Sequence, residues 1–165
     1  LVNDILLSFG TMDHLFVPVN KHGTQHSLGK IEEAYASQHA VLIFPAGLVS
    51  RKQNGRIEDL EWKKSFISKA LQYNKAVVPC YIDGRNYSFF YNLALWRRRL
   101  GIKSNIEMFY LGDEMFQQRN KTITVIFGEP IAASVFDKSR TQKQWAEQMK
   151  KHVYALGAGN AGPFS

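Results

Sequence analysis

The sequence has little cysteine and no long apolar run. Cys80 is the one cysteine among 165 residues, so no disulfide can form within the chain and nothing points to an oxidising compartment. No stretch approaches the roughly 20 consecutive apolar residues that a membrane-spanning helix needs, and no group of His, Cys, Asp and Glu has the spacing of a metal site. We therefore expect a chain that does not cross a bilayer and holds no metal.

Charge is unbalanced, although the rest of the composition is that of an ordinary globular domain. Hydrophobic residues make up 45%, aromatic residues 13% and charged residues 21%, which excludes a disordered tail, a collagen-like fibre and a coiled-coil rod. The 21 Lys and Arg residues exceed the 14 Asp and Glu residues, for a net charge of +7. This surplus favours an anionic partner such as a nucleic acid, a phosphorylated metabolite or an acidic membrane surface.

The first residues have the pattern of a helix that is already under way. Leu1–Phe9 reads as the second half of a helix, and Gly10 follows as a preferred helix stop. The sequence starts without an initiator methionine and without the pattern of a signal peptide. We expect residues 1–165 to form a single domain that is incomplete at its N-terminal end.

Hydrophobic periodicity predicts helices that alternate with strands. The predicted helices are Leu28–Gln38, Glu61–Tyr73, Ser88–Leu100 and Thr141–Leu156. The predicted strands are Leu15–Val19, Ala40–Phe44, Ala76–Ile82, Asn105–Leu111 and Thr122–Phe127. This alternation is typical of an α/β fold with a mixed, largely parallel sheet flanked by helices. The last two strands have no comparable helix between them, so we expect part of the sheet to be antiparallel.

Cations gather in the loops that follow the predicted strands. Ligands of such sheets bind beyond the carboxyl ends of the strands, which directs attention to three segments. They are Asn20–Gln25 with Lys21, Pro45–Asp59 with Arg51, Lys52 and Arg56, and Asp83–Tyr87 with Arg85. Convergent positive charge at strand ends is what a phosphate or another anionic head group requires. A loop as long as the second segment, without secondary structure of its own, is commonly functional or mobile.

Five blocks of sequence resemble the glycerophosphate and lysophospholipid acyltransferases of the PlsC type, which include a bacterial branch labelled hemolysin-like. The blocks are LFVPVNK, VLIFPAGLVSR, EWKKSF, VVPCYIDG and ITVIFGEPI. They span residues 15–131, and five blocks in the family's order and spacing are a far more specific signal than any one of them. The resemblance implies a glycerol-3-phosphate acyltransferase-like fold and acyl transfer to a lysolipid in membrane lipid synthesis.

The resemblance also implies which residues bind substrate. In the family, a Phe-Pro-Glu-Gly-Thr-Arg block after a buried strand helps to hold the phosphate of the acyl acceptor, and a Val-Pro strand lines the acceptor and acyl site. The matching positions here are Phe44, Pro45, Ala46, Gly47, Ser50 and Arg51 for the first block, and Val78 and Pro79 for the second. Lys52, Lys21 and Arg85 are added as nearby cations. The alternative for each cation is a solvated loop residue without a ligand.

Two departures from the family pattern limit what the resemblance implies. Ala46 replaces the family's glutamate and the arginine is displaced to Arg51, which leaves lysophosphatidate, another lysophospholipid or an amino-acid lipid open as the acceptor. The family's catalytic pair is a histidine base with an aspartate five positions later, and none of the five histidines has one. We therefore expect no catalytic residue in this chain, which should be inactive alone, with the pair upstream of Leu1 or lost.

The run Trp96-Arg97-Arg98-Arg99 closes a predicted helix that begins with aromatic residues. It fits a helix end stabilised by cations, a nucleic-acid contact or a membrane-surface patch. Three arginines exceed what a helix end uses, so we favour a helix that rests on an anionic lipid surface, with its arginines toward the head groups.

These observations leave functions of three classes. The first is an O-acyltransferase domain that transfers a fatty acyl group from acyl-CoA or acyl carrier protein to a lysolipid, without a bound cofactor and at the cytoplasmic face of the cell membrane. The second is a non-catalytic module that binds lipid or phosphate. The third, a nucleic-acid-binding domain, is disfavoured because the sequence has no recognised motif and no basic stripe along one helix.

Overall fold

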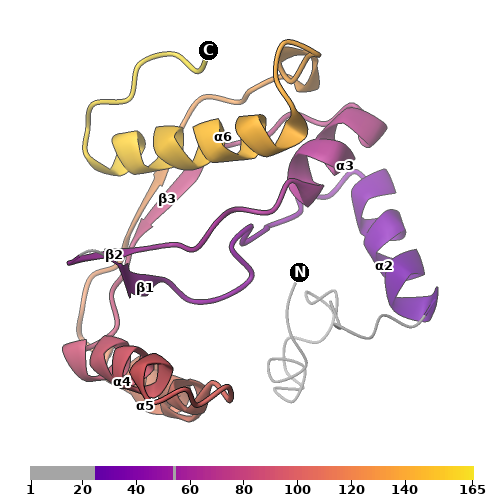
Figure 1. Ribbon diagram of the computed structural model, residues 1–165. Helices are drawn as coiled ribbons and strands as arrows, with labels where there is room; N and C mark the ends of the chain where they lie inside the picture. The colour runs from indigo at the N-terminus through magenta and orange to yellow at the C-terminus, as the bar shows by residue number, and fades with distance from the viewer. Residues whose placement is uncertain (1–24, 54) are drawn as a thin grey trace.

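The computed structural model describes residues 25–53 and 55–165 (Figure 1). In chain order its elements are α2 (Gln25–Ala36), β1 (Arg51–Gln53), β2 (Arg56–Glu58), α3 (Ser65–Tyr73), β3 (Cys80–Asp83), α4 (Ser88–Arg99), η2 (Ile106–Tyr110), α5 (Leu111–Phe116), β4 (Thr124–Phe127), η3 (Ala133–Val135) and α6 (Gln142–Gly157). This is a mixed α/β architecture. The predicted elements Leu1–Phe9 and Leu15–Val19, and the candidate Lys21, lie outside the described residues.

Two groups of helices stand at opposite ends of a two-stranded ribbon. Helices α3 and α6 lie at one end, α4 and α5 lie at the other, and β3 runs between them (Figure 1). The hydrophobic core belongs to the first group and consists of Phe66, Ile67, Ile131, Phe136, Trp145, Ala146, Met149 and Val153. The second group, which we call the α4–α5 unit (α4, η2 and α5), buries Phe90, Tyr91 and Ala94 of α4.

Helix α6 has the buried stripe that its sequence predicts and, in addition, a capping box at its start. The Thr141 hydroxyl accepts from the Gln144 N–H at 3.3 Å, and the Gln144 side chain accepts from the Thr141 N–H at 2.8 Å, which forms a capping box. Trp145, Met149 and Val153 follow at four-residue spacing and are buried in the core. The helix predicted at this end of the chain is confirmed.

The tail that follows α6 folds back on the core. Ring centroids of Phe164 and Phe136 lie 6.0 Å apart, and those of Phe164 and Trp145 lie 5.9 Å apart. The Phe164 ring also meets His152 edge-on at 5.2 Å. Because aromatic pairs at these distances are favourable, the last residues of the chain contribute to core packing.

Helix α2 is attached to α3 through Glu32. The Glu32 carboxylate accepts hydrogen bonds from the Lys69 ammonium and the Tyr73 hydroxyl, and the rings of Tyr35 and Tyr73 stack with centroids 5.9 Å apart. The hydrogen bond from Lys69, followed by the one from Tyr73, lowers the pKa of Glu32. The helix predicted over Leu28–Gln38 is confirmed and begins somewhat earlier, at the start of α2.

The two remaining predicted helices are also present. Glu61–Tyr73 corresponds to α3, which begins only at Ser65, and Ser88–Leu100 corresponds to α4. Within residues 25–53 and 55–165, no helix is both long and apolar enough to span a bilayer.

Every strand pair in the described part of the chain is antiparallel. In β1–β2, Arg51 lies opposite Glu58, and in β3–β4, Cys80 lies opposite Phe127. The strand predicted over Thr122–Phe127 and the antiparallel part of the sheet are thus confirmed. The expected largely parallel sheet is not found among the described residues, because the α4–α5 unit leaves the ribbon at its end and returns the chain as an antiparallel neighbour (Figure 1).

Two adjoining segments differ from the sequence prediction. Ala40–Phe44 is not a buried strand, since Leu42 and Phe44 are exposed. Pro45–Asp59 was expected to lack secondary structure, but it contains the β1–β2 hairpin, with Gly55 at φ +81° in the turn. The segment expected to be a loop therefore contains a hydrogen-bonded β-hairpin.

Asn105–Leu111 is helical rather than a strand. The segment forms η2 and leads directly into α5. A short apolar run has no periodicity that separates a strand from a buried helical turn, and here the helical turn places Glu107 in the interior of the α4–α5 unit.

One face of the β3–β4 ribbon is covered and the other faces outward. Tyr81 packs beneath α6, where its ring meets Tyr154 edge-on at 6.3 Å. On the opposite face, Ile82, Val125 and Phe127 are exposed. The strand predicted over Ala76–Ile82 is therefore present only in its second half, as β3, and it is buried on one face instead of two.

Gly157 ends α6 where a side chain has no room. A Cβ at this position would lie 2.5–2.6 Å from three atoms of the Tyr81 ring. Alanine usually stabilises a helix by roughly 0.5–1 kcal/mol relative to glycine. We expect Gly157→Ala instead to lower the free energy of unfolding by about 1–3 kcal/mol, because the added methyl overpacks the ring. Urea unfolding followed by circular dichroism measures the change.

The matched control is Gly162→Ala, where no atom lies within 4 Å of the added Cβ. This variant should unfold at the same urea concentration as the parent. A Gly157→Ala protein more stable than the parent would contradict the described contact with Tyr81.

Glu32 makes the attachment of α2 dependent on pH. Its pKa in the folded protein lies below the ordinary value of 4.5, so its stabilising contribution is complete above that value and is lost as the pH falls through the folded pKa. We expect the parent to be more stable than Glu32→Gln at neutral pH, with a difference that shrinks below pH 4.5. Urea unfolding at a series of pH values measures this difference.

The control repeats the comparison in a Lys69→Met, Tyr73→Phe background, which removes both donors. There, Glu32→Gln should have little effect at any pH. A difference in the parent background that stays constant from neutral to acidic pH would show that the two donors do not hold Glu32.

Candidate functional site

The first candidate block forms a tight turn. The Gly47 N–H donates to the Phe44 carbonyl at 3.0 Å, and Gly47 has φ +66°, a conformation that favours glycine. The Pro45 carbonyl accepts from the Lys63 N–H at 3.1 Å, which holds the turn against the segment that enters α3. Ala46 is buried behind the turn, and Phe44 is exposed.

The side chain of Lys63 reaches over this turn. Its Nζ atom lies 3.2 Å from the position that a Cβ would take on Gly47. Lys63 also lines an open concavity of about 400 Å³, whose other lining residues are Glu61, Trp62, Lys64 and Lys143. Three ammonium groups and one carboxylate therefore surround the concavity, and the surplus of positive charge suits an anionic ligand.

Asp59 joins the hairpin, the concavity and α6. Its carboxylate accepts from the Ser50 hydroxyl at 2.6 Å and from the Trp62 indole N–H at 3.0 Å. Its backbone N–H donates to the Tyr154 hydroxyl at 2.8 Å, and its carbonyl accepts from the Lys150 ammonium at 2.6 Å. The candidate Ser50 is thus engaged within the protein, where it positions the start of the hairpin.

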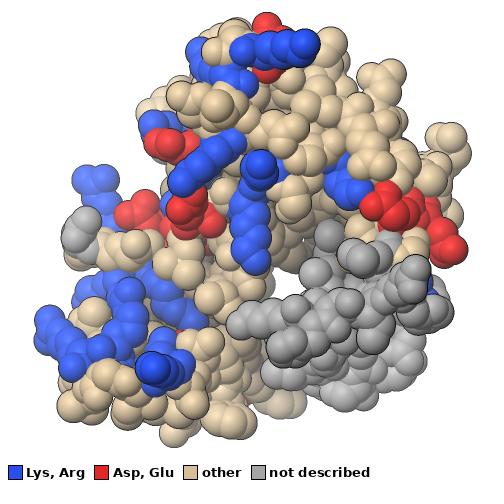
Figure 2. Space-filling view, turned by 45° about the vertical axis from the view of Figure 1, so that its right-hand side comes forward, with Lys and Arg blue, Asp and Glu red and all other residues tan. Residues whose placement is uncertain are grey.

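Exposed cations gather over the hairpin and α4. Figure 2 shows blue side chains grouped in this region, at the lower left of the view. Lys52, Arg56, Arg98 and Arg99 are all exposed, and Arg98 Nη2 donates to the Lys52 carbonyl at 3.4 Å. The structure therefore brings the candidate Lys52 together with the arginine run at the end of α4.

Arg85 and Arg51 both act on the pKa of the buried Tyr91 hydroxyl. Burial raises the pKa of Tyr91, while the guanidinium groups of Arg85 and Arg51 both act on it in the opposite direction. That the loop after β3 and the hairpin converge on one anion stays a prediction. The candidate Lys21, in the third segment, lies outside the described residues.

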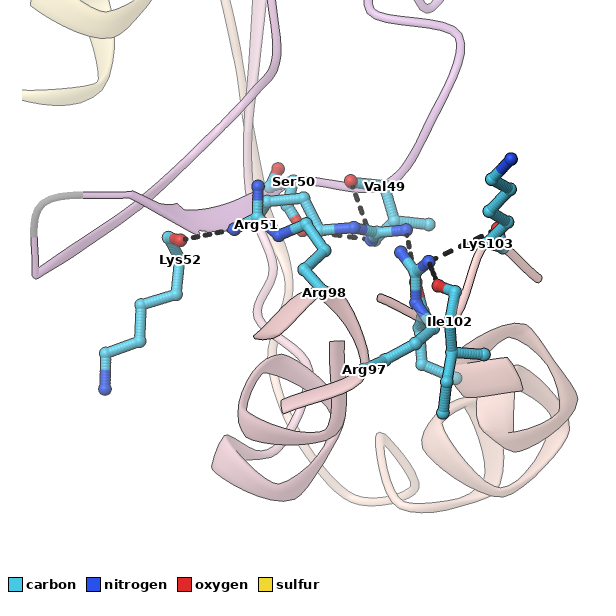
Figure 3. A network of polar contacts seen from close by, with 9 residues as sticks. Val49, Ser50, Arg51, Lys52, Arg97, Arg98, Ile102 and Lys103 are labelled. Atoms are coloured by element: carbon cyan, nitrogen blue, oxygen red, sulfur yellow. Dashed lines mark hydrogen bonds and ion pairs between the residues drawn. The ribbon is translucent and has the colours of Figure 1, made fainter. Parts of the chain in front are cut away.

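Arg51 itself is enclosed by the protein. Its side chain is 4% exposed, and Nη2 lies 2.9 Å from Glu107 Oε1 (Figure 3). Nη1 donates to the carbonyls of Val49 and Ser50 at 3.0 and 3.4 Å, and the guanidinium group lies 5.6 Å from the centre of the Phe90 ring. Burial lowers the pKa of Arg51, and the charge of Glu107 acts in the opposite direction.

Arg97 is the second partner of the same carboxylate. Its Nε atom lies 2.8 Å from Glu107 Oε2, and Nη1 donates to the Ile102 carbonyl at 2.8 Å. Arg97 is 8% exposed and Glu107 is fully buried. Arg97, predicted as part of the lipid-facing run, therefore lies inside the protein, and Figure 3 shows its guanidinium group beside the carbonyls of Ile102 and Lys103. We call Arg51, Glu107 and Arg97 the buried charge cluster; one carboxylate balances two guanidinium groups in it.

The other candidates lie on the ribbon and on the outside of α4. Val78 is exposed, and Pro79 is buried with its carbonyl accepting from the Gly128 N–H at 2.9 Å. Trp96 is exposed, as its predicted surface role requires. His39 and His152 are the histidines whose side chains the structure describes, and neither is paired with a carboxylate.

Sequence reasoning missed three acidic residues that organise this region. Glu107 and Asp59 hold the contacts above, and buried Glu114 accepts from the Tyr87 N–H at 2.6 Å, at the start of α4. The available signal was weak: Glu107 stands between Ile106 and Met108, and an acid flanked by apolar residues is a candidate for a buried ion pair.

The chain belongs to the acyltransferase family, since the family described as Acyltransferase matches residues 1–161. The acyltransferase resemblance drawn from the five blocks is thereby confirmed. A lyso-glycine lipid O-acyltransferase of Bacteroides thetaiotaomicron is 53% identical to it over 158 residues, which cover 94% of this chain and 58% of the relative. A protein of the same name from Phocaeicola vulgatus is 48% identical, with 94% and 57% covered.

The chain thus spans little more than half the length of these two relatives. No solved structure matches it. The described part of the chain offers cationic side chains around a turn and a concavity, which can bind an anionic head group.

Neutralising Glu107 should destabilise the fold strongly, because this carboxylate pairs with both Arg51 and Arg97 inside the protein. Glu107→Gln keeps the shape of the side chain but leaves two enclosed guanidinium groups without a counter-charge. We expect the free energy of unfolding to fall by about 3–5 kcal/mol, measured by urea unfolding. The control is Glu147→Gln, which removes an exposed pair with Lys151 at 3.0 Å and should have a far smaller effect, because solvent screens exposed pairs. Equal effects of the two substitutions would contradict the role of the cluster.

Proposed function

We propose that this chain is the acceptor-binding part of an O-acyltransferase whose acceptor is a lysolipid with a carboxylate head group, of the lyso-glycine lipid type. The observation that carries the proposal is that Arg51 is buried and that both of its terminal nitrogens bind oxygen atoms of the protein. Two relatives of 53% and 48% identity bear the name lyso-glycine lipid O-acyltransferase, and their name supports the same acceptor class.

The buried charge cluster argues against a phosphate acceptor at Arg51. A phosphate monoester is typically held by bidentate contacts from an arginine. Both terminal nitrogens of Arg51 already bind oxygen atoms of the protein, from Glu107 and from the carbonyls of Val49 and Ser50. Glu107 would also repel a dianion placed beside it. Arg51 therefore acts as a positioning residue that holds the hairpin, instead of a phosphate ligand.

The cation that stays accessible at the turn is Lys63. It is exposed, and its ammonium group lies over Gly47 at the edge of the concavity. An ammonium group is a compact charge that suits a single carboxylate, which is what a glycine head group presents. The exposed Phe44 beside it offers an apolar surface for the start of an acyl chain.

The reaction is a direct transfer. The acceptor hydroxyl oxygen attacks the thioester carbonyl carbon, the new C–O bond forms, the C–S bond breaks and the thiol leaves with a proton. The donor is acyl-CoA or acyl carrier protein. The histidine base and its aspartate are supplied from outside this sequence, a placement that the greater length of the relatives supports. This chain alone is expected to be inactive.

The same proposal includes the finer family assignment. The five ordered blocks support the PlsC-type branch and, within it, the bacterial hemolysin-like group. A lysolipid acceptor supports a position at the cytoplasmic face of the cell membrane. Lysophosphatidate is the acceptor for comparison, because the block around Phe44 resembles the phosphate-binding block of the PlsC-type acyltransferases.

A second function is a non-catalytic lipid-binding module. It is favoured by one observation, that the chain carries no histidine with an aspartate five positions later. In that case the turn, Lys63 and the concavity bind a lysolipid without chemistry.

The deciding experiment is an acyl-transfer assay with the whole protein. Radiolabelled acyl-CoA and acyl carrier protein are each supplied with lyso-glycine lipid or with lysophosphatidate at equal concentration. We expect label in the diacylated glycine lipid and a rate at least about tenfold lower with lysophosphatidate, a factor equal to roughly 1.4 kcal/mol of discrimination. Equal rates would overturn the acceptor assignment. Binding without any transfer would favour the lipid-binding module.

The same assay tests Lys63. Because a charge-assisted contact to the head group would be lost, Lys63→Gln should raise KM for lyso-glycine lipid by about three- to tenfold, with a smaller change in kcat. The matched control is Lys151→Gln on α6, another exposed lysine, which should leave both constants unchanged. An unchanged KM in Lys63→Gln would remove Lys63 from the acceptor site.

A further inference from the structure

Helix α4 has two apolar faces, and only one of them is buried. Phe90, Tyr91 and Ala94 point into the α4–α5 unit. On another face, Phe89, Trp96 and Leu100 are 54%, 61% and 75% exposed, and their spacing of seven and four residues places them on one side of the helix. A helix that packed only against the rest of the α4–α5 unit would need one apolar face, so the second apolar face needs another explanation.

The neighbouring helical turns expose large side chains as well. Phe109 at the end of η2 is 87% exposed, and Phe116 at the end of α5 is 73% exposed. Since η2 leads directly into α5, these two exposed rings belong to one continuous run of helical turns. The ring of Tyr110 meets that of Phe89 edge-on at 5.2 Å, which joins this surface to that of α4.

We call these exposed residues the α4–α5 patch. Its members are Phe89, Trp96, Leu100, Phe109, Tyr110, Met115 and Phe116. Exposed apolar residues scattered singly are normal, but a group of large ones on consecutive elements marks an interaction surface.

The charges around the patch are nearly all of one sign. Between residues 84 and 121 the exposed cations are Arg85, Arg98, Arg99, Lys103, Arg119 and Lys121. The segment has three acidic residues, and the fold buries two of them, Glu107 and Glu114, which leaves Asp113 as its exposed carboxylate. The lower end of the molecule in Figure 2 shows this arrangement, with blue side chains above a tan surface.

Exposed apolar side chains surrounded by cations favour some binding partners over others. A second copy of the chain would bring six like charges against six, and the resulting repulsion opposes association. The cores of protein interfaces are also depleted of lysine. Aromatic and aliphatic side chains surrounded by Lys and Arg are instead the composition of a surface that lies in the head-group region of an anionic bilayer.

We propose that the α4–α5 patch is a membrane-binding surface that inserts its rings between the lipids of an anionic bilayer. Phe109, Phe116 and Trp96 enter the boundary between head groups and acyl chains, and Arg99, Lys103 and Arg119 contact lipid phosphates. Arg97 takes no part, because it is committed to Glu107. The proposal goes beyond the proposed function and does not depend on the identity of the acceptor.

The test is sedimentation of the protein with vesicles that contain no lysolipid. The parent should bind vesicles of phosphatidylcholine mixed with phosphatidylglycerol and bind pure phosphatidylcholine more weakly. The double variant Phe109→Ser, Phe116→Ser should bind the mixed vesicles with an affinity at least about tenfold lower. The conservative pair Phe109→Leu, Phe116→Leu should retain most of the binding.

A second set of variants separates charge from insertion. The triple variant Arg99→Gln, Lys103→Gln, Arg119→Gln should lose the preference for phosphatidylglycerol, with about a tenfold fall in binding to mixed vesicles. The matched control, Leu71→Ser with Val135→Ser, changes two exposed apolar residues outside the α4–α5 unit and should bind as the parent does.

A direct probe avoids reliance on loss of binding. In a Cys80→Ser background, Phe116→Cys labelled with an environment-sensitive fluorophore should shift its emission to the blue when vesicles are added, whereas a label at Leu71→Cys should not. Parent-like binding by the Phe109→Ser, Phe116→Ser protein would overturn the proposal. The proposal would also be overturned if the label at position 116 did not shift while the protein was bound to vesicles. It would be overturned as well if the serine substitutions dissociated a dimer and left vesicle binding unchanged.

Discussion

The position of the hairpin relative to the α4–α5 unit depends on one carboxylate. Glu107 is fully buried, and it meets an arginine from β1 on one side and an arginine from α4 on the other. Charges taken out of water are costly unless each is paired and hydrogen-bonded, so the three side chains are compatible with few arrangements of their backbones. The position of the start of the hairpin against α4 follows from satisfying this small group.

Asp59 acts in a similar way beside it, at the same open end of the hairpin, where Arg51 pairs with Glu58. Where Glu107 links β1 to α4, Asp59 links Ser50 and Trp62 to Tyr154 and Lys150 of α6. The open end of the hairpin is thus held by polar contacts with helices on two sides rather than by a larger sheet. The side chain of Glu107 and both the side chain and the backbone of Asp59 therefore fix the start and the end of the segment that carries the candidate cations Lys52 and Arg56.

Sequence patterns predicted the elements whose burial has a clear period. The stripe Trp145, Met149 and Val153 specified α6, and the helices α2, α3 and α4 were found in the same way. The patterns failed where a long-range partner decides the structure. A run of three arginines does not reveal that Arg97 turns inward, and Glu107 is separated by 56 residues from Arg51, with which it pairs. The block around Gly47 was singled out from the sequence, but Asp59 was not.

The three tryptophans are distributed so that each belongs to a different part of the molecule. Trp145 is buried in the core, Trp62 donates its indole N–H to Asp59 at 3.0 Å beside the concavity, and Trp96 stands on the outside of α4. The protein therefore carries three intrinsic optical reporters. Collisional quenchers in water reach Trp96 readily and Trp145 poorly, so the emission of the unmodified chain distinguishes its interior from its outer helix.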